Sequence, residues 1–120
     1  MTIGEAARLT GLAESTLRFY ERRNLLDVGR DSGGRRDFSE EDVAWIQFIC
    51  RLKETGMPLK DIERYAALRA QGEPTMRERL LMLREHRTVV LARLGQWEEC
   101  LRHLDDKITL YEQAVNVHGY

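Results

Sequence analysis

The 120-residue sequence has few residues that interrupt helices or cross-link chains, since it contains two prolines and two cysteines. A chain with so little proline leaves room for long helices. Cys50 and Cys100 lie far apart, and the sequence opens on Met1–Glu5 without an apolar signal segment. Both features fit free thiols in a reducing compartment, so we expect a cytoplasmic protein.

Long hydrophobic runs and an excess of charge of either sign are also missing. No stretch approaches the roughly 18 apolar residues of a membrane span, so no membrane segment is expected. Nineteen basic residues balance 20 acidic ones and give a formal charge of −1. Any contact with nucleic acid must therefore come from a local cluster of basic residues.

Residue patterns of enzymes are scarce. The chain is too short for a Rossmann or barrel enzyme, it has no glycine loop for phosphate, and its three histidines, at 86, 103 and 118, all lie in the last third of the chain. Cys100 and His103 have a spacing compatible with two metal ligands, but two ligands do not make a site, and packing at an interface is the ordinary explanation. We expect no enzyme activity, no cofactor and no metal.

Two short helices joined by a glycine turn are predicted at the start of the chain. Thr2 and Glu5 have capping-box spacing, and Gly11 is a natural C-terminal stop. A second helix follows from about Ala13 to Arg23, although Ala13 lacks a side chain that can cap it. This order is typical of a helix-turn-helix.

A glycine-rich segment, residues 27–38, follows and predicts a β-hairpin with its tip near Ser32–Gly34. We call residues 27–38 the wing. Ser39 and Asp42 then cap a helix that runs to Gly56, and Pro58 opens a helix from Leu59 to about Ala70. These elements define a first domain, residues 1–72, with a second segment at residues 73–120.

The second segment carries a heptad pattern that runs from Met76 to Val115 over about five heptads. Thr75 and Glu78 have capping-box spacing at its start. We call the row of apolar residues in this pattern the seam. The helix is roughly 60 Å long, which exceeds what the small first domain can cover, so the seam needs a partner to bury it. A homodimer is the simplest such partner. The expected interface residues are Leu80, Leu83, Val90, Leu94, Trp97, Leu101, Leu104 and Ile108.

One position of the seam is occupied by a charged residue, Arg87. A single charge in such a seam is expected to fix the register or orientation of the two paired helices rather than to add stability. The pattern alone does not distinguish parallel from antiparallel pairing. The fold class is therefore mostly α: a winged helix-turn-helix domain followed by a long dimerisation helix.

Four ordered motifs resemble those of MerR-family transcriptional regulators, and together they are specific. They are Ile3–Ala7, Thr16–Glu21, Gly34–Ser39 and Leu52–Leu59, and they cover residues 1 to about 70. The resemblance implies a dimer with antiparallel long helices that binds double-stranded promoter DNA. It also implies an activated form that bends and untwists an over-long promoter spacer for RNA polymerase, at a deformation cost of about 1–6 kcal/mol.

The resemblance and the docking geometry of such motifs together indicate the DNA contacts. Ser15 and Thr16 begin the helix expected in the major groove. Arg18, Arg36 and Lys53 match basic positions of the family, whereas Arg35 stands where many relatives have tyrosine. Tyr20 matches a tyrosine whose hydroxyl can reach phosphate, although packing against the first helix is a second reading of it.

The inducer cannot be identified from the sequence. Some short members of the family respond to electrophiles through a cysteine in the helix that carries Cys50, but Cys50 is displaced by one residue from that position. Cys50 is therefore either a thiol sensor or an inert core residue. Trp45, Trp97 and Tyr111 are either core residues or the lining of an effector pocket. The competing function is an architectural or coiled-coil interaction module with no effector.

Overall fold

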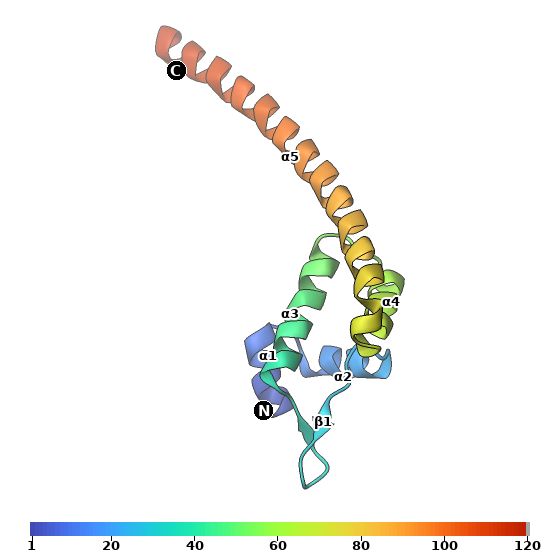
Figure 1. The fold of residues 1–120 in the computed structure, drawn as a ribbon. Coiled ribbons are helices and arrows are strands. Elements are labelled where there is room, and N and C mark those ends of the chain that lie inside the picture. The colour runs from blue at the N-terminus through green and yellow to red at the C-terminus, as the bar shows by residue number, and fades with distance from the viewer. Residues whose placement is uncertain (120) are drawn as a thin grey trace. The chain divides into compact units, whose positions relative to one another are not determined.

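The computed structural model describes residues 1–119 and divides into two compact units, residues 1–83 and the segment from Arg84 onward. The first unit holds helices α1 to α4, a two-stranded hairpin and the start of α5 (Figure 1). The second unit is the remainder of α5. The mostly α fold with a helix-turn-helix and a long C-terminal helix is confirmed.

The first two helices form as their capping residues predict. α1 spans Ile3–Thr10, with the capping box of Thr2 and Glu5 at its start and Gly11 at φ 73° after its end. α2 spans Glu14–Arg22 and starts at Ala13 without a side-chain cap. α2 ends where Asn24 takes the left-handed conformation (φ 60°), which lets the chain turn back into the core at Leu25.

The wing is a short antiparallel hairpin, visible below the helices in Figure 1, in which β1 (Gly29–Arg30) pairs with β2 (Arg36–Asp37). Backbone bonds between Asp31 and both Gly34 and Arg35 close its turn, and Oδ1 of Asp31 also accepts hydrogen bonds from the backbone N–H groups of Gly33 and Arg35. Gly34 has φ 79°, a left-handed conformation that favours glycine at this tip.

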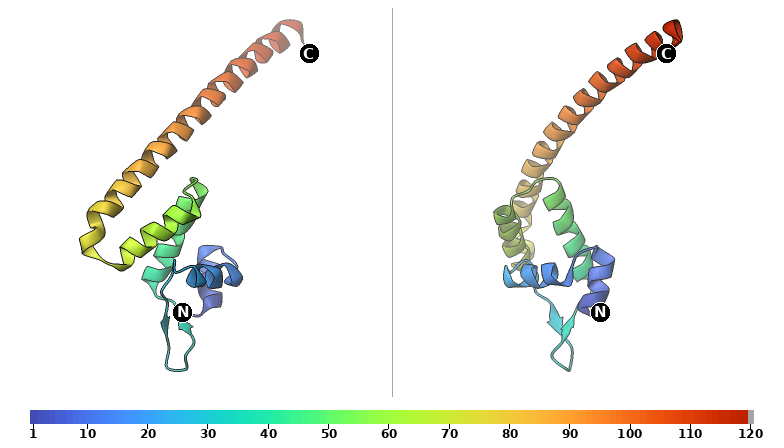
Figure 2. Two further views of the ribbon diagram at one scale, coloured as in Figure 1. Left: turned by 90° about the vertical axis from the view of Figure 1, so that its right-hand side faces the viewer. Right: turned by 180° about the vertical axis from the view of Figure 1, so that it is seen from behind.

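Two further helices complete the first unit. α3 spans Glu40–Glu54 behind a capping box of Ser39 and Asp42, and α4 spans Leu59–Ala70 behind Pro58. α1 packs against both α2 and α3, and α3 packs against α4 (Figure 2). The fully buried side chains at the centre of this core are Leu17, Tyr20, Ile46, Ile49 and Ile62.

The base of the wing packs into this core. Leu25, Leu26, Val28 and Phe38 are buried at the base of the wing. Trp45 is buried on α3, where its ring stacks on Tyr65 at 5.7 Å and its Nε1 donates to the Leu25 carbonyl at 2.7 Å. Trp45 is therefore a core residue, which was one of the two alternatives expected for it.

The start of α5 differs from the prediction. α5 spans Met76–His118 and is preceded by a 3₁₀ turn, η1 (Glu73–Thr75), so helical backbone begins before Thr75. The Thr75 hydroxyl donates to the carbonyls of Leu68 and Gly72 and accepts from Nε of Arg79. The predicted capping box of Thr75 and Glu78 is wrong because Thr75 is a buried joint between α4 and α5 rather than the first cap of the long helix.

None of the helices within residues 1–119 is both long and apolar enough to span a membrane.

Candidate nucleic-acid interface

The outer face of α2 is open along its length. Ser15 is exposed and Thr16 half-buried in the first turn, while Leu17 and Tyr20 hold the opposite face in the core. Arg18 is exposed and forms a loose pair with Glu14 at 3.6 Å. A helix that is anchored on one side and polar on the other can enter a major groove without rearranging the core.

Phe19 and its neighbours add a feature of α2 that sequence reasoning missed. Phe19 is partly exposed, and the guanidinium groups of Arg22 and Arg23 lie 6.0 and 5.9 Å from its ring centre. Arg23 also pairs with Glu63 of α4 at 2.6 Å. The signal that could have found this cluster is the grouping of aromatic and basic residues in residues 18–23.

Tyr20 and Lys53 lie together, although they come from different helices. Tyr20 is 1% exposed, and its hydroxyl accepts a hydrogen bond from Nζ of Lys53 at 3.2 Å. The Lys53 ammonium group also lies 5.4 Å from the Tyr20 ring centre. The Tyr20 ring is therefore packed in the core. Contact with a phosphate remains a prediction for the exposed Lys53 and for the Tyr20 hydroxyl beside it.

The wing places its arginines differently. Arg35 is exposed at the tip. Arg36 is half-buried, and its Nε donates to Oε1 of Glu21 at 2.8 Å, which ties the wing to α2. Arg30 on the facing strand pairs with the other oxygen of Glu21 at 3.4 Å. Arg30 and Glu21 were not among the predicted site residues, because only the folded hairpin brings them together.

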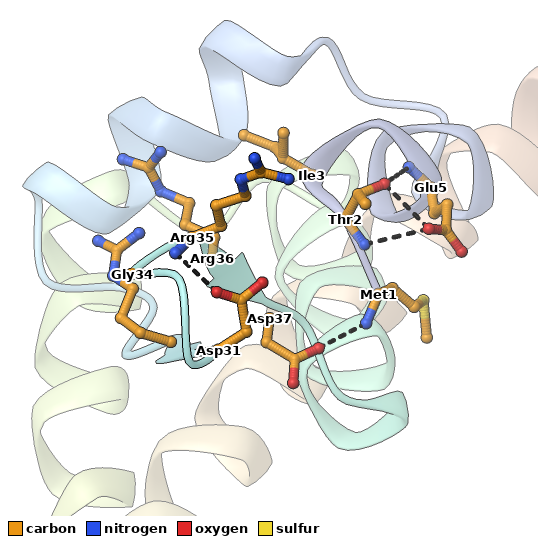
Figure 3. A pocket seen from close by; sticks show the side chains of 10 residues that line it. Met1, Thr2, Ile3, Glu5, Asp31, Gly34, Arg35, Arg36 and Asp37 are labelled. Atoms are coloured by element: carbon orange, nitrogen blue, oxygen red, sulfur yellow. Dashed lines mark hydrogen bonds and ion pairs between the residues drawn. The ribbon is translucent and has the colours of Figure 1, made fainter.

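A hollow of about 510 Å³ lies between the wing and the start of α1 (Figure 3). Arg30, Arg35 and Arg36 line it from the wing, and Thr2 and Glu5 line it from α1. The hollow is open to solvent, and Asp31 and Asp37 of the wing also line it. Its three arginines are therefore balanced by three carboxylates, counting Glu5, and the hollow as a whole is not a basic site.

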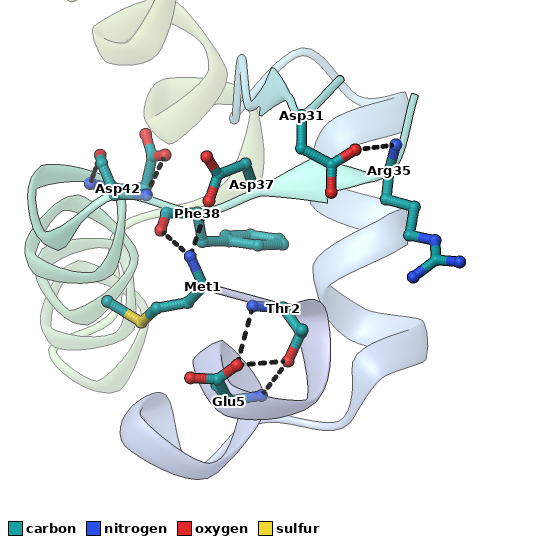
Figure 4. A network of polar contacts seen from close by, with 9 residues as sticks. Met1, Thr2, Glu5, Asp31, Arg35, Asp37, Phe38 and Asp42 are labelled. Carbon is teal, nitrogen blue, oxygen red and sulfur yellow. Dashed lines mark hydrogen bonds and ion pairs between the residues drawn. The ribbon is translucent and has the colours of Figure 1, made fainter. Parts of the chain in front are cut away.

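Polar contacts at the base of the wing connect it to the start of α1 (Figure 4). The amino group of Met1 donates to Asp37 at 2.7 Å and to the Phe38 carbonyl at 2.8 Å. The bond to Asp37 raises the pKa of this amino group. At the next turn, the hydrogen bonds from Thr2 lower the pKa of Glu5 and keep its carboxylate charged.

Cys50 lies on α3, half-buried, in a shallow groove shared with the end of α1. Burial is the main cause that raises the pKa of its thiol, and Glu54 raises it further, while Lys53 and Arg51 act in the opposite direction. A raised pKa keeps the sulfur in the less reactive thiol form. The raised pKa favours the inert residue over the thiol sensor, and both stay predictions for Cys50.

The other residues considered for a metal or an effector lie on α5. Cys100 and His103 are exposed, and no group of three or more metal-binding side chains exists within residues 1–119. Trp97 and Tyr111 are 75% and 62% exposed, so neither lines a core in the single chain.

The predicted interface residues of α5 fall into two groups. Leu83 packs partly against the core of the first unit. Leu80 and the later seam residues are exposed or only half-buried, and no residue of α5 is buried. The exposed members are Leu80, Leu94, Trp97, Leu101, Leu104 and Ile108, and Val90 is half-buried.

Family models match most of the chain. The model described as MerR HTH family regulatory protein matches residues 1–68, and the model described as MerR, DNA binding matches residues 43–107. An uncharacterised HTH-type transcriptional regulator of Haemophilus influenzae is 37% identical over 114 residues, which cover 94% of this chain and 84% of the relative. The regulator AdhR of Bacillus subtilis is 36% identical over 72% of this chain and 63% of its own length.

Solved structures agree with this match. HiNmlR, a MerR-family regulator lacking the sensor domain and bound to promoter DNA, superimposes with a TM-score of 0.83 at 37% identity, over 94% of this chain and 90% of that one. A MerR-family regulator of Bacillus thuringiensis superimposes with a TM-score of 0.78 at 30% identity, over 91% and 96% of the two chains. The chain therefore belongs to the MerR family of DNA-binding transcriptional regulators and is not an enzyme.

Proposed function

We propose that the protein binds a two-fold promoter site as a homodimer and controls transcription by changing the shape of the DNA spacer for RNA polymerase. In this proposal residues 1–72 contact the duplex, residues 73–120 form the dimer, and the protein works in the cytoplasm. The observation that carries the proposal is the contact between Arg36 and Glu21 at 2.8 Å, because it holds an arginine of the wing beside the exposed face of α2. One rigid surface can then touch a groove and the adjoining backbone.

The comparison with HiNmlR supports the DNA part of the proposal, since that relative is a complex with promoter DNA. We propose Ser15 and Thr16 for contacts with base edges, and Arg18, Arg35, Arg36, Lys53 and the Tyr20 hydroxyl for contacts with phosphate. Phosphate contacts fix the register of a protein on DNA, whereas contacts with base edges carry the sequence preference. The two classes of residue are therefore expected to respond differently to substitution.

The dimer part is supported by the exposed seam of α5. Burial of each large apolar side chain against a partner would lower the free energy by about 1.5–3 kcal/mol relative to leaving that side chain in water. A second copy offers the same seam, so the surface is self-complementary about a two-fold axis. A two-fold dimer in turn requires a DNA site with two half-sites.

A response to an electrophile through Cys50 is the part of the proposal that rests on the family resemblance alone. The raised pKa of Cys50 is the opposite of what activates a sensor thiol. The competing function, an architectural or coiled-coil module, shares the long helix but predicts no change in transcription.

The test of DNA binding uses a duplex selected by the wild-type protein from a randomised pool. Replacing Arg18 and Arg36 together by alanine is expected to weaken binding and to reduce the salt dependence of binding by about two charges, while the oligomeric state is unchanged. Unchanged affinity in the double variant would remove the DNA-contact assignment. Failure of the wild-type protein to enrich any duplex would remove the proposed function itself.

The shape mechanism is tested separately, by energy transfer between dyes at the two ends of the selected duplex. Binding is expected to bring the ends closer, and transcription by RNA polymerase from a promoter with a long spacer is expected to change with it. An unbent duplex together with unaltered transcription would favour the interaction module instead.

A further inference from the structure

One acidic side chain joins the two strands of the wing to the recognition helix. Glu21 is the next-to-last residue of α2, and its side chain is 21% exposed. Its Oε1 accepts from Nε of Arg36 at 2.8 Å, and its Oε2 accepts from Nη2 of Arg30 at 3.4 Å. Each oxygen of one carboxylate thus binds an arginine from a different strand.

The two arginines face each other across the hairpin. Arg30 is the direct cross-strand partner of Arg36 in the β1–β2 pair. Like charges in directly opposed positions destabilise a strand pair, and each strand here has only two residues. Glu21 supplies the negative charge that offsets this repulsion, so the three side chains form one cluster with a net charge of +1.

The cluster is fixed to a rigid part of the protein. Glu21 follows Tyr20 directly, and Tyr20 is buried at the centre of the core. The carboxylate therefore has little freedom to follow the wing, and the wing arginines must come to it. Arg36 is the more restrained of the two, because its side chain is 30% exposed and its bond to Glu21 is the shorter.

We infer that Glu21 is a positioning residue for DNA recognition, which holds Arg30 and Arg36 in one arrangement relative to α2. The inference rests on the proposed function. A guanidinium carries donors on its two terminal nitrogens besides Nε, so Arg36 can bind Glu21 and a phosphate at the same time.

This arrangement makes the wing sensitive to DNA shape. Arginines held at fixed positions meet phosphates only where the duplex brings its backbone to those positions, and the shape of the backbone depends on sequence. Arginines released from Glu21 reach the phosphates of any duplex, but each must be ordered again on binding, which weakens the specific complex several-fold. Glu21 thus contributes to selectivity although, as an acid, it repels phosphate.

The test measures affinity for two duplexes of equal length, one selected by the wild-type protein and one of random sequence. Glu21→Gln keeps the size of the side chain and removes its charge. We expect the ratio of the two affinities to fall about tenfold, or about 1.4 kcal/mol, with affinity for the random duplex unchanged or higher. A merely structural or merely electrostatic role would shift both affinities together.

Asp27→Asn is the matched control, because it removes one negative charge from an exposed residue of the wing that lies before β1. It is expected to leave the affinity ratio at the wild-type value. An equal ratio in Glu21→Gln and Asp27→Asn would overturn the inference, while the enrichment of a duplex by the wild-type protein would still support the proposed function.

A double-mutant cycle decides whether Glu21 acts through the arginines. In a background in which Arg30 and Arg36 are both alanine, Glu21→Gln is expected to have no further effect on the affinity ratio. A fall in the ratio that persists in that background would overturn the inference. If Glu21→Gln does not fold, the mobility of the Arg36 Nε–H group in the free wild-type protein, measured by nuclear magnetic resonance, decides instead: a rigid group supports the inference and a freely mobile one contradicts it.

Discussion

At the scale of the residue, Tyr20 has a position that can be compared with the role the family resemblance implies for it. Its ring is buried among the helices, and its hydroxyl accepts from the exposed Lys53 of α3. The family resemblance assigns this tyrosine to phosphate, whereas its burial assigns it to packing. Packing describes the apolar ring, and contact of the hydroxyl with phosphate stays a prediction for the polar tip of the side chain.

Cys50 gives the first prediction at the residue scale. Its raised pKa means that less thiolate is present in the folded protein than in the unfolded chain at the same pH. In a Cys100→Ser variant, alkylation of Cys50 by iodoacetamide is therefore expected to be slower at neutral pH than in urea. The midpoint of its pH–rate profile is expected to lie above that of the unfolded chain.

The same shift has a consequence for stability. A group whose pKa is raised by folding stabilises the folded state below its ordinary pKa, and this contribution is lost as the pH rises through the raised value. Replacement of Cys50 by serine removes the ionisable thiol, so the loss of stability at alkaline pH is expected to be smaller in that variant. An alkylation midpoint below that of the unfolded chain would contradict the assignment of Cys50 as a packed residue.

At the scale of the element, α2 is a helix that starts without a side-chain cap. Ala13 has the extended conformation of an N-cap (φ −69°, ψ 149°), but it has no side-chain oxygen to accept from the backbone N–H of Thr16. Ala13→Ser is expected to stabilise the protein by about 1 kcal/mol, because a serine at this position caps the helix. Urea unfolding followed by circular dichroism at fixed protein concentration measures the change.

Ser39→Ala is the matched control, since Ser39 caps α3 and its hydroxyl accepts from the Asp42 N–H at 3.0 Å. This variant is expected to lose about 1 kcal/mol by the same mechanism. A gain in stability for Ala13→Ser and a loss for Ser39→Ala, of similar size, would show that the cap is the cause. No gain in Ala13→Ser would mean that the turn before α2 does not accept a capping side chain.

The elements that the sequence predicts well are those with local signals. Thr2 with Glu5, Ser39 with Asp42, and Gly11 act over a few residues, and each lies where it was expected. The prediction for Thr75 failed because its hydroxyl bonds back to Leu68, which only the packed joint of α4 and η1 brings within reach.

The site shows the same division between local and long-range contacts. The position of Arg36 in the wing follows from its motif, but its bond to Glu21 joins residues fifteen positions apart. That bond forms only when the hairpin folds back onto α2. The exposed residues of α2 were therefore predictable from the sequence, whereas the acidic partner of the wing was not.

At the scale of the whole molecule, the exposed apolar seam of α5 is the basis of the proposed dimer. A winged helix-turn-helix with a formal charge of −1 for the chain has little general attraction for DNA. Two such domains on one duplex bind far more tightly than one, because the second contact becomes intramolecular. The proposed dimer thus compensates for the balance of charge in each first unit, where the basic residues do not outnumber the acidic ones.

The last prediction tests this dependence at Leu94, an exposed residue near the middle of the seam. Leu94→Asp places a charge in the proposed interface, where its burial without a partner costs several kcal/mol, so the dimer is expected to dissociate.

Ala92→Asp is the control, because residue 92 is exposed and lies on the opposite face of the helix. Sedimentation equilibrium is expected to give a monomer for Leu94→Asp and a dimer for Ala92→Asp, and only the latter retains tight binding to the selected duplex. A dimeric Leu94→Asp variant with wild-type affinity would show that the seam of α5 is not the interface, and the two-fold reading of the DNA site would fall with it.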